Sequence, residues 1–381
     1  MSVCIVYDCL FPYTIGGAER WYRNLAERLA AAGNEVTFLT LRQWERGTVP
    51  AVPGVHVVAV GPRMALYTGS GRRRLLPPVV FGLGVLGHLL RHGGRYDVVH
   101  TASFPYFSLL AAAVARGRRR FRVVVDWHEV WTSEYWREYL GPVAGRIGWW
   151  VQQACLRVPQ RAFCFSRLHE RRLRDLGVNG ELTRLEGQYA GPVDPSPSQP
   201  ARPVVVFVGR LIPEKRPTAV VPALARAREQ IPELRAEIYG DGPERENVLR
   251  AISELGLDEY VSAPGFVDAD VLERARSSAL CLVLPSSREG YGLVVLEAAA
   301  SGVPVVVVAG PDNAAIELVE EGLNGTVAES ATPDDLAEAI IRIHRAGQAL
   351  RDSSADWFRN NADHLSLERS LETVVHAYAS S

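Results

Sequence analysis

Short apolar runs alternate with longer amphipathic segments along both halves of this 381-residue chain. This alternation predicts parallel strands joined by helices, with helices on both faces of each sheet, and hence an α/β fold class. The clearest helix covers residues 19–32 and ends at Gly33 and Asn34. The expected strands are residues 4–7, 35–40, 56–60, 98–100, 123–126 and 162–166 in the first half, and 204–208, 236–240, 261–263, 281–284 and 304–308 in the second.

The two halves are separated by residues 187–203, which are rich in proline and show no periodicity. A boundary near residue 190 gives two domains, 1–190 and 191–354, each large enough for its own core. Residues 1–200 carry 25 Arg against 15 Asp and Glu, a net charge of +10, whereas residues 201–381 have a net charge of −11. The basic half suits an anionic acceptor or an anionic membrane face, and mutual attraction of the halves is the weaker explanation.

Residues 285–305 predict an anion site at the start of a short apolar helix. Gly290 and Gly292 let a ligand approach the backbone, and a helix N-terminus offers unsatisfied N–H groups and the positive end of the helix dipole. The N–H groups concerned belong to Tyr291, Gly292 and Leu293. We therefore expect a phosphate here.

Two carboxylates, Glu289 and Glu297, flank this helix start. They would repel a phosphate ligand unless they accepted hydrogen bonds from its hydroxyl groups. The combination predicts a ligand that carries both phosphate and sugar hydroxyls, such as a nucleotide sugar.

Lys215 is the only lysine among 42 basic residues. It follows the expected strand at 204–208, in a loop that opens with Gly209 and Arg210. Ligands bind at the carboxyl ends of strands in open α/β sheets, and a guanidinium beside an ammonium suits a diphosphate. A solvated basic loop in an arginine-rich chain is the alternative.

Residues 126–136 place four aromatic residues and three acids directly after an expected strand. Aromatic faces cover the apolar C–H faces of sugars, and carboxylates accept hydroxyl protons. The alternative is an aromatic cluster at a domain or membrane edge. His128 lies within this segment.

Together these segments resemble the retaining GT-B glycosyltransferases of glycosyltransferase family 4. The resemblance covers nearly the whole chain, and its most specific part is the Glu-x7-Glu segment from Glu289 to Glu297. The other matching segments are Gly16-Gly17-Ala18-Glu19, Asp97-Val98-Val99-His100, His128, Gly209-Arg210 with Lys215, and Gly240-Asp241-Gly242-Pro243.

The resemblance implies two Rossmann-like domains whose parallel sheets face a central cleft, with a C-terminal helix at 355–379 that crosses back to the first domain. It implies transfer of a hexosyl unit from a nucleoside diphosphate sugar to an acceptor hydroxyl, with retention of the anomeric configuration. UDP and GDP sugars are the favoured donors. The acceptor, whether glycan, lipid-linked molecule or small metabolite, stays open. Arg210 and Lys215 would stabilise the leaving diphosphate, and Glu289 would hold the transferred sugar.

The remaining expected roles concern the ends of the donor. Glu297 would bind the ribose hydroxyls, and the backbone of Phe266 and Val267 would meet the base. Gly16 and Gly17 follow the first strand and form a second strand-to-helix anion site. His128, at the position of the family's active-site histidine, would contact either a donor-sugar hydroxyl or the acceptor.

Several other functions are disfavoured. Asp268 and Asp270 resemble a metal-binding Asp-x-Asp, but they directly precede a helical pattern and are better explained as capping and first-turn charges, so no metal and no cofactor is expected. The dinucleotide-binding Gly-x-Gly-x-x-Gly pattern is absent, which disfavours a nicotinamide-dependent oxidoreductase. No nucleic-acid partner is expected.

Localisation is predicted from what the sequence lacks. The start of the chain reads as a strand rather than a signal peptide, and the five cysteines show no metal-binding spacing, so we expect a cytoplasmic protein with reduced thiols. The longest apolar stretch, residues 75–90, is interrupted by Pro77 and Pro78 and is too short to span a bilayer. Its basic flanks would suit peripheral contact with an anionic membrane, although a buried connector is the commoner outcome.

Two alternative functions stay open. One is a nucleotide-sugar epimerase or sugar phosphorylase of the same fold, and the other is a non-catalytic partner subunit.

Overall fold

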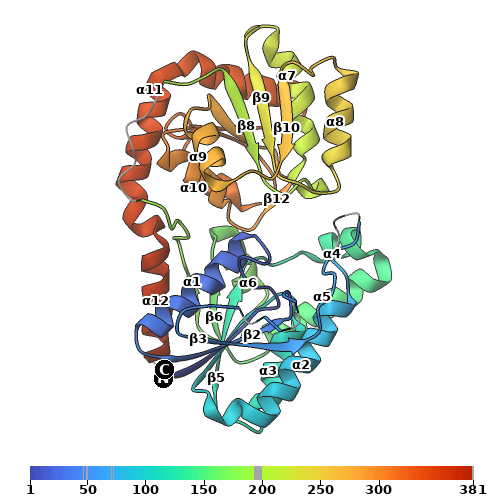
Figure 1. Ribbon diagram of the computed structural model, residues 1–381, viewed down its shortest axis with the longest axis vertical. Helices are drawn as coiled ribbons and strands as arrows, with labels where there is room; N and C mark the ends of the chain where they lie inside the picture. The colour runs from blue at the N-terminus through green and yellow to red at the C-terminus, as the bar shows by residue number, and fades with distance from the viewer. Residues whose placement is uncertain (46, 49, 70, 72, 193–199, 380–381) are drawn as a thin grey trace. The chain divides into compact units, whose positions relative to one another are not determined.

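The structure is a computed structural model that describes residues 1–45, 47–48, 50–69, 71, 73–192 and 200–379. Internal contacts divide the chain into two units (Figure 1). Unit 1 comprises Met1–Thr68, Arg72–Glu186 and Ser370–Ser381, and unit 2 comprises Gly69–Gly71 and Gly187–Arg369. The division after Glu186 falls four residues before the boundary expected near 190. Residues 193–199 of the proline-rich segment lie outside the described residues.

Unit 1 is built on a parallel sheet with the order β3-β2-β1-β4-β5-β6-β7. Its strands are β1 (Ser2–Val6), β2 (Glu35–Leu41), β3 (Val55–Gly61), β4 (Val98–Ala102), β5 (Arg122–Trp127), β6 (Arg161–Cys164) and β7 (Leu182–Arg184). Its helices are α1 (Gly17–Ala31), α2 (Leu76–His92), η1 (Gly93–Arg95), α3 (Phe107–Arg116), α4 (Ser133–Leu140), α5 (Pro142–Leu156), α6 (Arg167–Asp175) and most of α12 (Leu367–Ala379). The strands predicted from the first half are all present, and β7 is an addition.

Unit 2 repeats this plan with a parallel sheet of order β10-β9-β8-β11-β13-β15. Its strands are β8 (Val204–Val208), β9 (Arg235–Tyr239), β10 (Val261–Gly265), β11 (Cys281–Leu284), β13 (Val305–Val308) and β15 (Gly325–Ala328), with a small parallel pair of β12 (Arg288–Glu289) and β14 (Asp312–Asn313). Its helices are η2 (Pro213–Lys215), η3 (Pro217–Ala219), α7 (Val220–Arg228), α8 (Arg245–Glu254), α9 (Ala269–Ser277), α10 (Leu293–Ala300), η4 (Ala314–Leu318) and α11 (Pro333–Leu365).

Burial explains why the central strands could be recognised. Val205, Phe207, Val283 and Val306 are fully buried, as expected for parallel strands covered on both faces. In unit 1, residues of β1, β4 and β5 form one core with α2, α3 and α5. The five cysteines are buried and form no disulfides, which agrees with the expected reduced thiols.

The C-terminal helix differs from the expectation of one helix over residues 355–379. The structure has α11 up to Leu365 and a separate α12 from Leu367, because Ser366 takes an extended conformation. Only residues from Ser370 onward group with unit 1. Tyr378 anchors this segment there, since its buried hydroxyl lies 2.5 Å from Nδ1 of His100 on β4.

The apolar stretch at 75–90 forms most of α2, with one face buried and the other exposed. Phe81, Val85 and Leu89 are fully buried on one face, whereas Leu76 and Leu83 are exposed. None of the described helices is long and apolar enough to cross a membrane.

Candidate active site

The strand orders place the candidate residues at the carboxyl ends of the sheets. In unit 2 the order reverses between β8 and β11, and such a switch point is where open α/β sheets bind ligands. The loop after β8 carries Lys215, and the loop after β11 carries Glu289. The topology therefore brings together two segments that the sequence separates by 74 positions.

Lys215 and Glu289 form a direct ion pair. Nζ of Lys215 lies 2.5 Å from Oε1 of Glu289, and Oγ of Ser286 donates to the same oxygen at 2.7 Å. The Glu289 side chain is 8% exposed and that of Lys215 is 22% exposed, so the glutamate is buried while the lysine side chain is partly exposed. Because an ammonium has three N–H donors, Lys215 keeps donors for a ligand phosphate while Glu289 fixes its position.

The loop that carries Glu289 is fastened to the loop that carries Lys215. Both the main-chain N–H and the hydroxyl of Ser287 donate to the carbonyl of Glu214, at 2.9 and 3.2 Å. Parallel pairing of β12 with β14 holds Glu289 from the other side. The pair is therefore built on backbone that is fixed before any ligand arrives.

The helix start predicted as an anion site is α10, whose N-cap is Gly292. Gly292 has φ 99°, and a Cβ there would lie 2.6 Å from Cβ of Ala315, so glycine is required on both grounds. The first N–H groups of a helix have no intrahelical acceptor, and they begin here at Leu293. Tyr291 is buried beside them, and Gly290 is half-buried.

Glu297 lies one turn inside α10 and is held by a partner that the sequence did not predict. Nη1 of Arg276, on α9, donates to Oε2 of Glu297 at 2.8 Å, and Arg276 also pairs with Glu273. Arg276 is 9% exposed. The expected ribose-binding carboxylate is therefore oriented by a buried guanidinium.

The loop after β8 packs closely against the loop after β9. Gly240 has φ 124°, and a Cβ there would lie 1.9 Å from the carbonyl oxygen of Gly209. Leu211 donates its N–H to the carbonyl of Asp241 at 2.9 Å. Arg210 follows Gly209 in this loop and has an exposed side chain.

The loop after β10 carries Phe266 and Val267. Phe266 is 68% exposed, which leaves its ring available to a ligand or solvent. Asp268 occupies the N-cap of α9 and Asp270 its first turn, but the Asp268 side chain makes no capping hydrogen bond; its main-chain carbonyl accepts from Val271 and Leu272 instead. The described residues contain no group of three or more His, Cys, Asp or Glu that could hold a metal ion.

In unit 1, Gly16 is the N-cap of α1, but the side chain of Glu19 already lies against it. A Cβ on residue 16 would be 2.3 Å from Oε2 of Glu19, which is 8% exposed. Glu19 is the third residue of the helix, where a glutamate often reaches back over the helix start. A bound anion at Gly16 and Gly17 would have to compete with this carboxylate.

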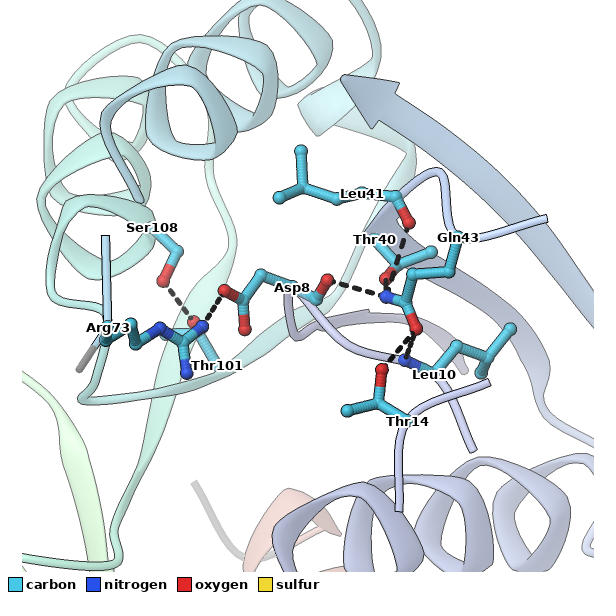
Figure 2. Close-up of polar contacts among 9 residues, drawn as sticks. All are labelled: Asp8, Leu10, Thr14, Thr40, Leu41, Gln43, Arg73, Thr101 and Ser108. Atoms are coloured by element: carbon cyan, nitrogen blue, oxygen red, sulfur yellow. Dashed lines mark hydrogen bonds and ion pairs between the residues drawn. The ribbon is translucent and has the colours of Figure 1, made fainter. Parts of the chain in front are cut away.

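Asp8 and Arg73 form a second ion pair, at the carboxyl end of β1 (Figure 2). Asp8 is fully buried. Burial disfavours the charge of Arg73, but Asp8, with smaller effects of Tyr67, Cys9 and Tyr7, outweighs it, so the pKa of Arg73 is raised. Figure 2 also shows Gln43, whose side chain binds the Asp8 carbonyl and the Leu10 N–H and so fixes the loop before α1.

His128 lies just beyond β5, in a buried aromatic setting. Its ring stacks on that of Phe165 with 4.7 Å between the centroids, and it meets the Tyr22 ring edge-to-face with 5.8 Å between the centroids. Burial lowers the pKa of His128, against the opposing effect of Asp126 and Glu129, so the imidazole is neutral near pH 7. No described residue hydrogen-bonds to its Nε2, and that atom is buried from solvent.

Asp126 anchors the same strand end. The Trp21 indole donates to its Oδ2 at 2.7 Å, and Nε2 of His100 lies 2.9 Å from its Oδ1. Burial alone would raise the pKa of Asp126, but His100, His128 and the Trp21 N–H lower it. The carboxylate therefore stays charged beside His128.

Sequence reasoning missed four residues that shape these sites: Ser286, Arg276, Asp8 and Arg73. Ser286 and Asp8 carried a usable signal, because both follow expected strands. Arg276 and Arg73 carried no such signal, because nothing in the local sequence distinguishes them from the other charged residues around them.

Comparison with known proteins now gives the family. A family model described as "Glycosyl transferases group 1" matches residues 194–362, and one described as "Glycosyl transferase 4-like domain" matches residues 16–185. The chain belongs to the family 4-like glycosyltransferases.

Two relatives illustrate the range of this family. A GDP-mannose-dependent alpha-(1-6)-phosphatidylinositol monomannoside mannosyltransferase from Mycolicibacterium smegmatis is 36% identical over 170 residues, which is 42% of this chain and 44% of that protein. The match thus spans less than half of that relative's length. A D-inositol 3-phosphate glycosyltransferase from Nocardioides is 27% identical over 95% of this chain and 85% of its own.

Solved structures show that the fold of this glycosyltransferase is GT-B. Sucrose-phosphate synthase from Thermosynechococcus elongatus aligns with a TM-score of 0.79 at 20% identity, over 99% of this chain and 98% of that chain. HepE from Anabaena, in complex with UDP-glucose, aligns with a TM-score of 0.75 at 17% identity over the whole of both chains. The two predicted Rossmann-like domains are confirmed.

Proposed function

We propose that this glycosyltransferase moves a hexosyl unit from a nucleoside diphosphate sugar to an acceptor hydroxyl, with retention at the anomeric carbon and without a metal ion. UDP and GDP sugars are the first donor candidates. The observation that carries the proposal is the Lys215–Glu289 pair, which places an ammonium and a carboxylate together at the switch point of the unit 2 sheet.

Each half of the donor has a matching group in unit 2. Lys215, Arg210 and the first-turn N–H groups of α10 supply positive charge for the diphosphate. Glu289 accepts hydrogen bonds from the sugar hydroxyls, and Glu297, oriented by Arg276, accepts hydrogen bonds from the ribose hydroxyls. The main chain of Phe266 and Val267 meets the base.

In the reaction, the bond between the anomeric carbon and the diphosphate oxygen breaks, and its electron pair leaves with the diphosphate. A new bond forms from the acceptor oxygen to the same face of the sugar, and the acceptor proton passes to the departing phosphate. Stabilising the negative charge of that leaving group is the main task of Lys215, Arg210 and α10. These groups supply the positive charge that a metal ion supplies in other transferases.

Unit 1 would contribute His128, whose half-buried, neutral imidazole can hydrogen-bond a hydroxyl of the sugar or of the acceptor. The names of the two relatives above suggest phosphatidylinositol monomannoside and D-inositol 3-phosphate as the first acceptors to try.

Binding and turnover test the proposal separately. Thermal-shift measurements with UDP, GDP and ADP should identify one base by the largest rise in Tm. With the matching sugar donors, release of nucleoside diphosphate should depend on an acceptor, and NMR of the product should show the donor's anomeric configuration.

The same assays separate the alternatives. An epimerase would change the sugar without releasing nucleotide, and a phosphorylase would require inorganic phosphate. A non-catalytic subunit would show no turnover with any donor, although Lys215, Arg210 and both glutamates are all present.

A further inference from the structure

A groove of about 680 Å³ opens at the edge of the unit 1 sheet where the parallel strands begin. Its lining includes Met1 ahead of β1, Asp97 ahead of β4, and residues of the 116–122 segment that joins α3 to β5. Asp97 donates its N–H to the carbonyl of Ser2, and Arg122 donates its N–H to the carbonyl of Asp97. We call this feature the amino-end groove. Asp8 and His128 follow the other ends of these strands, so the groove is separate from the candidate active site.

The amino-end groove is strongly basic. Residues 116–122 contain five arginines, and four of them, Arg116, Arg119, Arg120 and Arg122, line the groove. The lining holds one carboxylate, that of Asp97, and its Oδ2 already accepts the N–H of Ser2 at 2.8 Å. Guanidinium groups match the geometry of phosphate oxygens, so this charge excess favours a phosphate.

Two of the arginines are held in place before any ligand arrives. Nη1 of Arg116 donates to the carbonyl of Pro159 at 2.8 Å, and Nη2 of Arg119 donates to the carbonyl of Leu90 at 2.7 Å. The stem of Arg119 lies over Gly93, where a Cβ would come within 3.2 Å of it. Fixed side chains lose less entropy on binding than mobile ones.

Arg119 also has an unsatisfied donor. Its Nε is buried, and no described residue accepts a hydrogen bond from it. Buried N–H groups almost always have a partner, so this one needs a water molecule or a ligand. The simpler explanation of the five arginines is a basic segment that is only solvated. Such a segment would need neither main-chain anchors nor a buried donor.

We propose that the amino-end groove binds a phosphate-bearing anion, which is either the headgroup of an anionic lipid or a free phosphorylated metabolite. Both sources present the same chemistry to the arginines. The ligand is not the sugar donor, because the groove lies at the opposite edge of the sheet from the carboxyl ends, where the donor is expected.

The test compares two double variants of the full chain. Arg116→Ala/Arg120→Ala removes two exposed arginines of the groove lining, one of which is anchored on the carbonyl of Pro159. Arg63→Ala/Arg171→Ala removes the same charge from two exposed positions of unit 1, after β3 and on α6, and is the matched control. Both pairs lie outside the proposed catalytic groups, so acceptor-dependent turnover in detergent solution should match the wild type.

The lipid source is tested by vesicle sedimentation. Phosphatidylcholine vesicles with about 30% phosphatidylglycerol are compared with pure phosphatidylcholine, because each arginine near an anionic surface contributes roughly fivefold in affinity. The groove variant should bind the anionic vesicles about 25-fold more weakly than the wild type. The vesicle affinity of the control should fall by less than about threefold, because the control loses only the long-range effect of its net charge.

The free-metabolite source is tested by calorimetry with inorganic pyrophosphate. Every protein in this arm carries Lys215→Ala, so that the donor site contributes little. The groove variant should lose about tenfold in affinity relative to the control, which is the size of one hydrogen bond to a charged group.

The outcomes identify the source. Loss in the vesicle arm alone assigns a lipid headgroup, loss in the pyrophosphate arm alone assigns a free phosphorylated ligand, and loss in both supports the shared chemistry. The proposal is overturned if the wild type binds neither probe, or if the groove variant and the control bind equally in both arms.

Discussion

Nζ of Lys215 lies 2.5 Å from Oε1 of Glu289, although the two residues belong to loops that follow different strands, β8 and β11. The carboxylate is nearly buried and is also held by Ser286. The pair thus fixes the ammonium where a departing diphosphate would need it.

Replacing Lys215 by alanine should lower kcat by about 10²–10³-fold, the usual effect of removing one preorganised donor from a developing negative charge. The fold should survive, because the Lys215 side chain reaches solvent. Acceptor-dependent release of nucleoside diphosphate measures the effect, with circular dichroism as the control for folding. The kcat of Lys215→Arg should lie between those of the wild type and Lys215→Ala, because arginine keeps the charge but changes the geometry. Near wild-type turnover of Lys215→Ala would show that the diphosphate lies elsewhere.

The sequence predicted the central strands well because parallel strands buried on both faces are nearly continuous apolar runs, such as residues 204–208. It missed β7 and β15, which lie at sheet edges. β7 has three half-buried residues, and β15 begins with Gly325 and Thr326, so neither presents such a run.

The site was predicted as a set of residues rather than as a set of contacts. Lys215 and Glu289 could each be singled out by local pattern, but their pairing depends on which strands are neighbours in the sheet. Arg276 could not be found, because its hydrogen bond to Glu297 joins α9 to α10 only once the chain is folded. Likewise, the sequence offered Gly16 as an anion site, and only the structure shows Glu19 lying against it.

Transfer should continue in excess EDTA, because Lys215, Arg210 and the start of α10 are proposed to supply the positive charge. Initial rates with and without EDTA, after removal of metal from all reagents, measure this. Loss of activity that Mg²⁺ or Mn²⁺ restores would overturn the proposal and return attention to Asp268 and Asp270.

Gly292→Ala should destabilise unit 2, because residue 292 has φ 99° and its Cβ would lie 2.6 Å from that of Ala315. We expect a cost of roughly 2–4 kcal/mol from backbone strain and overpacking. Gly17→Ala is the matched control, since a Cβ there meets nothing within 4 Å and the residue begins a helix. Differential scanning calorimetry should show a lowered Tm for the first variant and an unchanged or slightly raised Tm for the second. Equal Tm values would contradict the steric argument.

The stability of unit 1 should depend on His88 in mild acid. Burial, followed by the nearby His92, His56 and Arg95, lowers the pKa of His88 from 6.5 to about 4. A lowered pKa means that the folded state prefers the neutral ring, so the stabilisation is complete above pH 6.5 and is lost as the pH falls from 6.5 to about 4.

His88→Gln removes this titration, and so its Tm should fall less over that pH range than the Tm of the wild type. His344→Gln, at an exposed position of α11, is the control and should follow the wild type. If the Tm of His88→Gln falls as steeply as that of the wild type, the ring is not held neutral by the fold.

The two glutamates of the α10 segment should differ in the kinetic constant that they control. Glu297→Gln should mainly raise the donor KM, because ribose contacts are made equally in the ground state and the transition state. Glu289→Gln should mainly lower kcat, since positive charge develops on the sugar only as the diphosphate departs, and the amide oxygen can still accept from Ser286.

Calorimetry with the nucleoside diphosphate alone separates these effects. Affinity should fall for Glu297→Gln and stay nearly unchanged for Glu289→Gln. Glu273→Gln is the control for a general loosening of α9 from α10. It removes the other carboxylate that pairs with Arg276 and leaves the proposed ligand contacts in place. The affinity of this variant for the nucleoside diphosphate should stay near that of the wild type. If Glu289→Gln abolishes nucleotide binding while Glu297→Gln leaves it intact, the donor lies along this segment in the reverse direction.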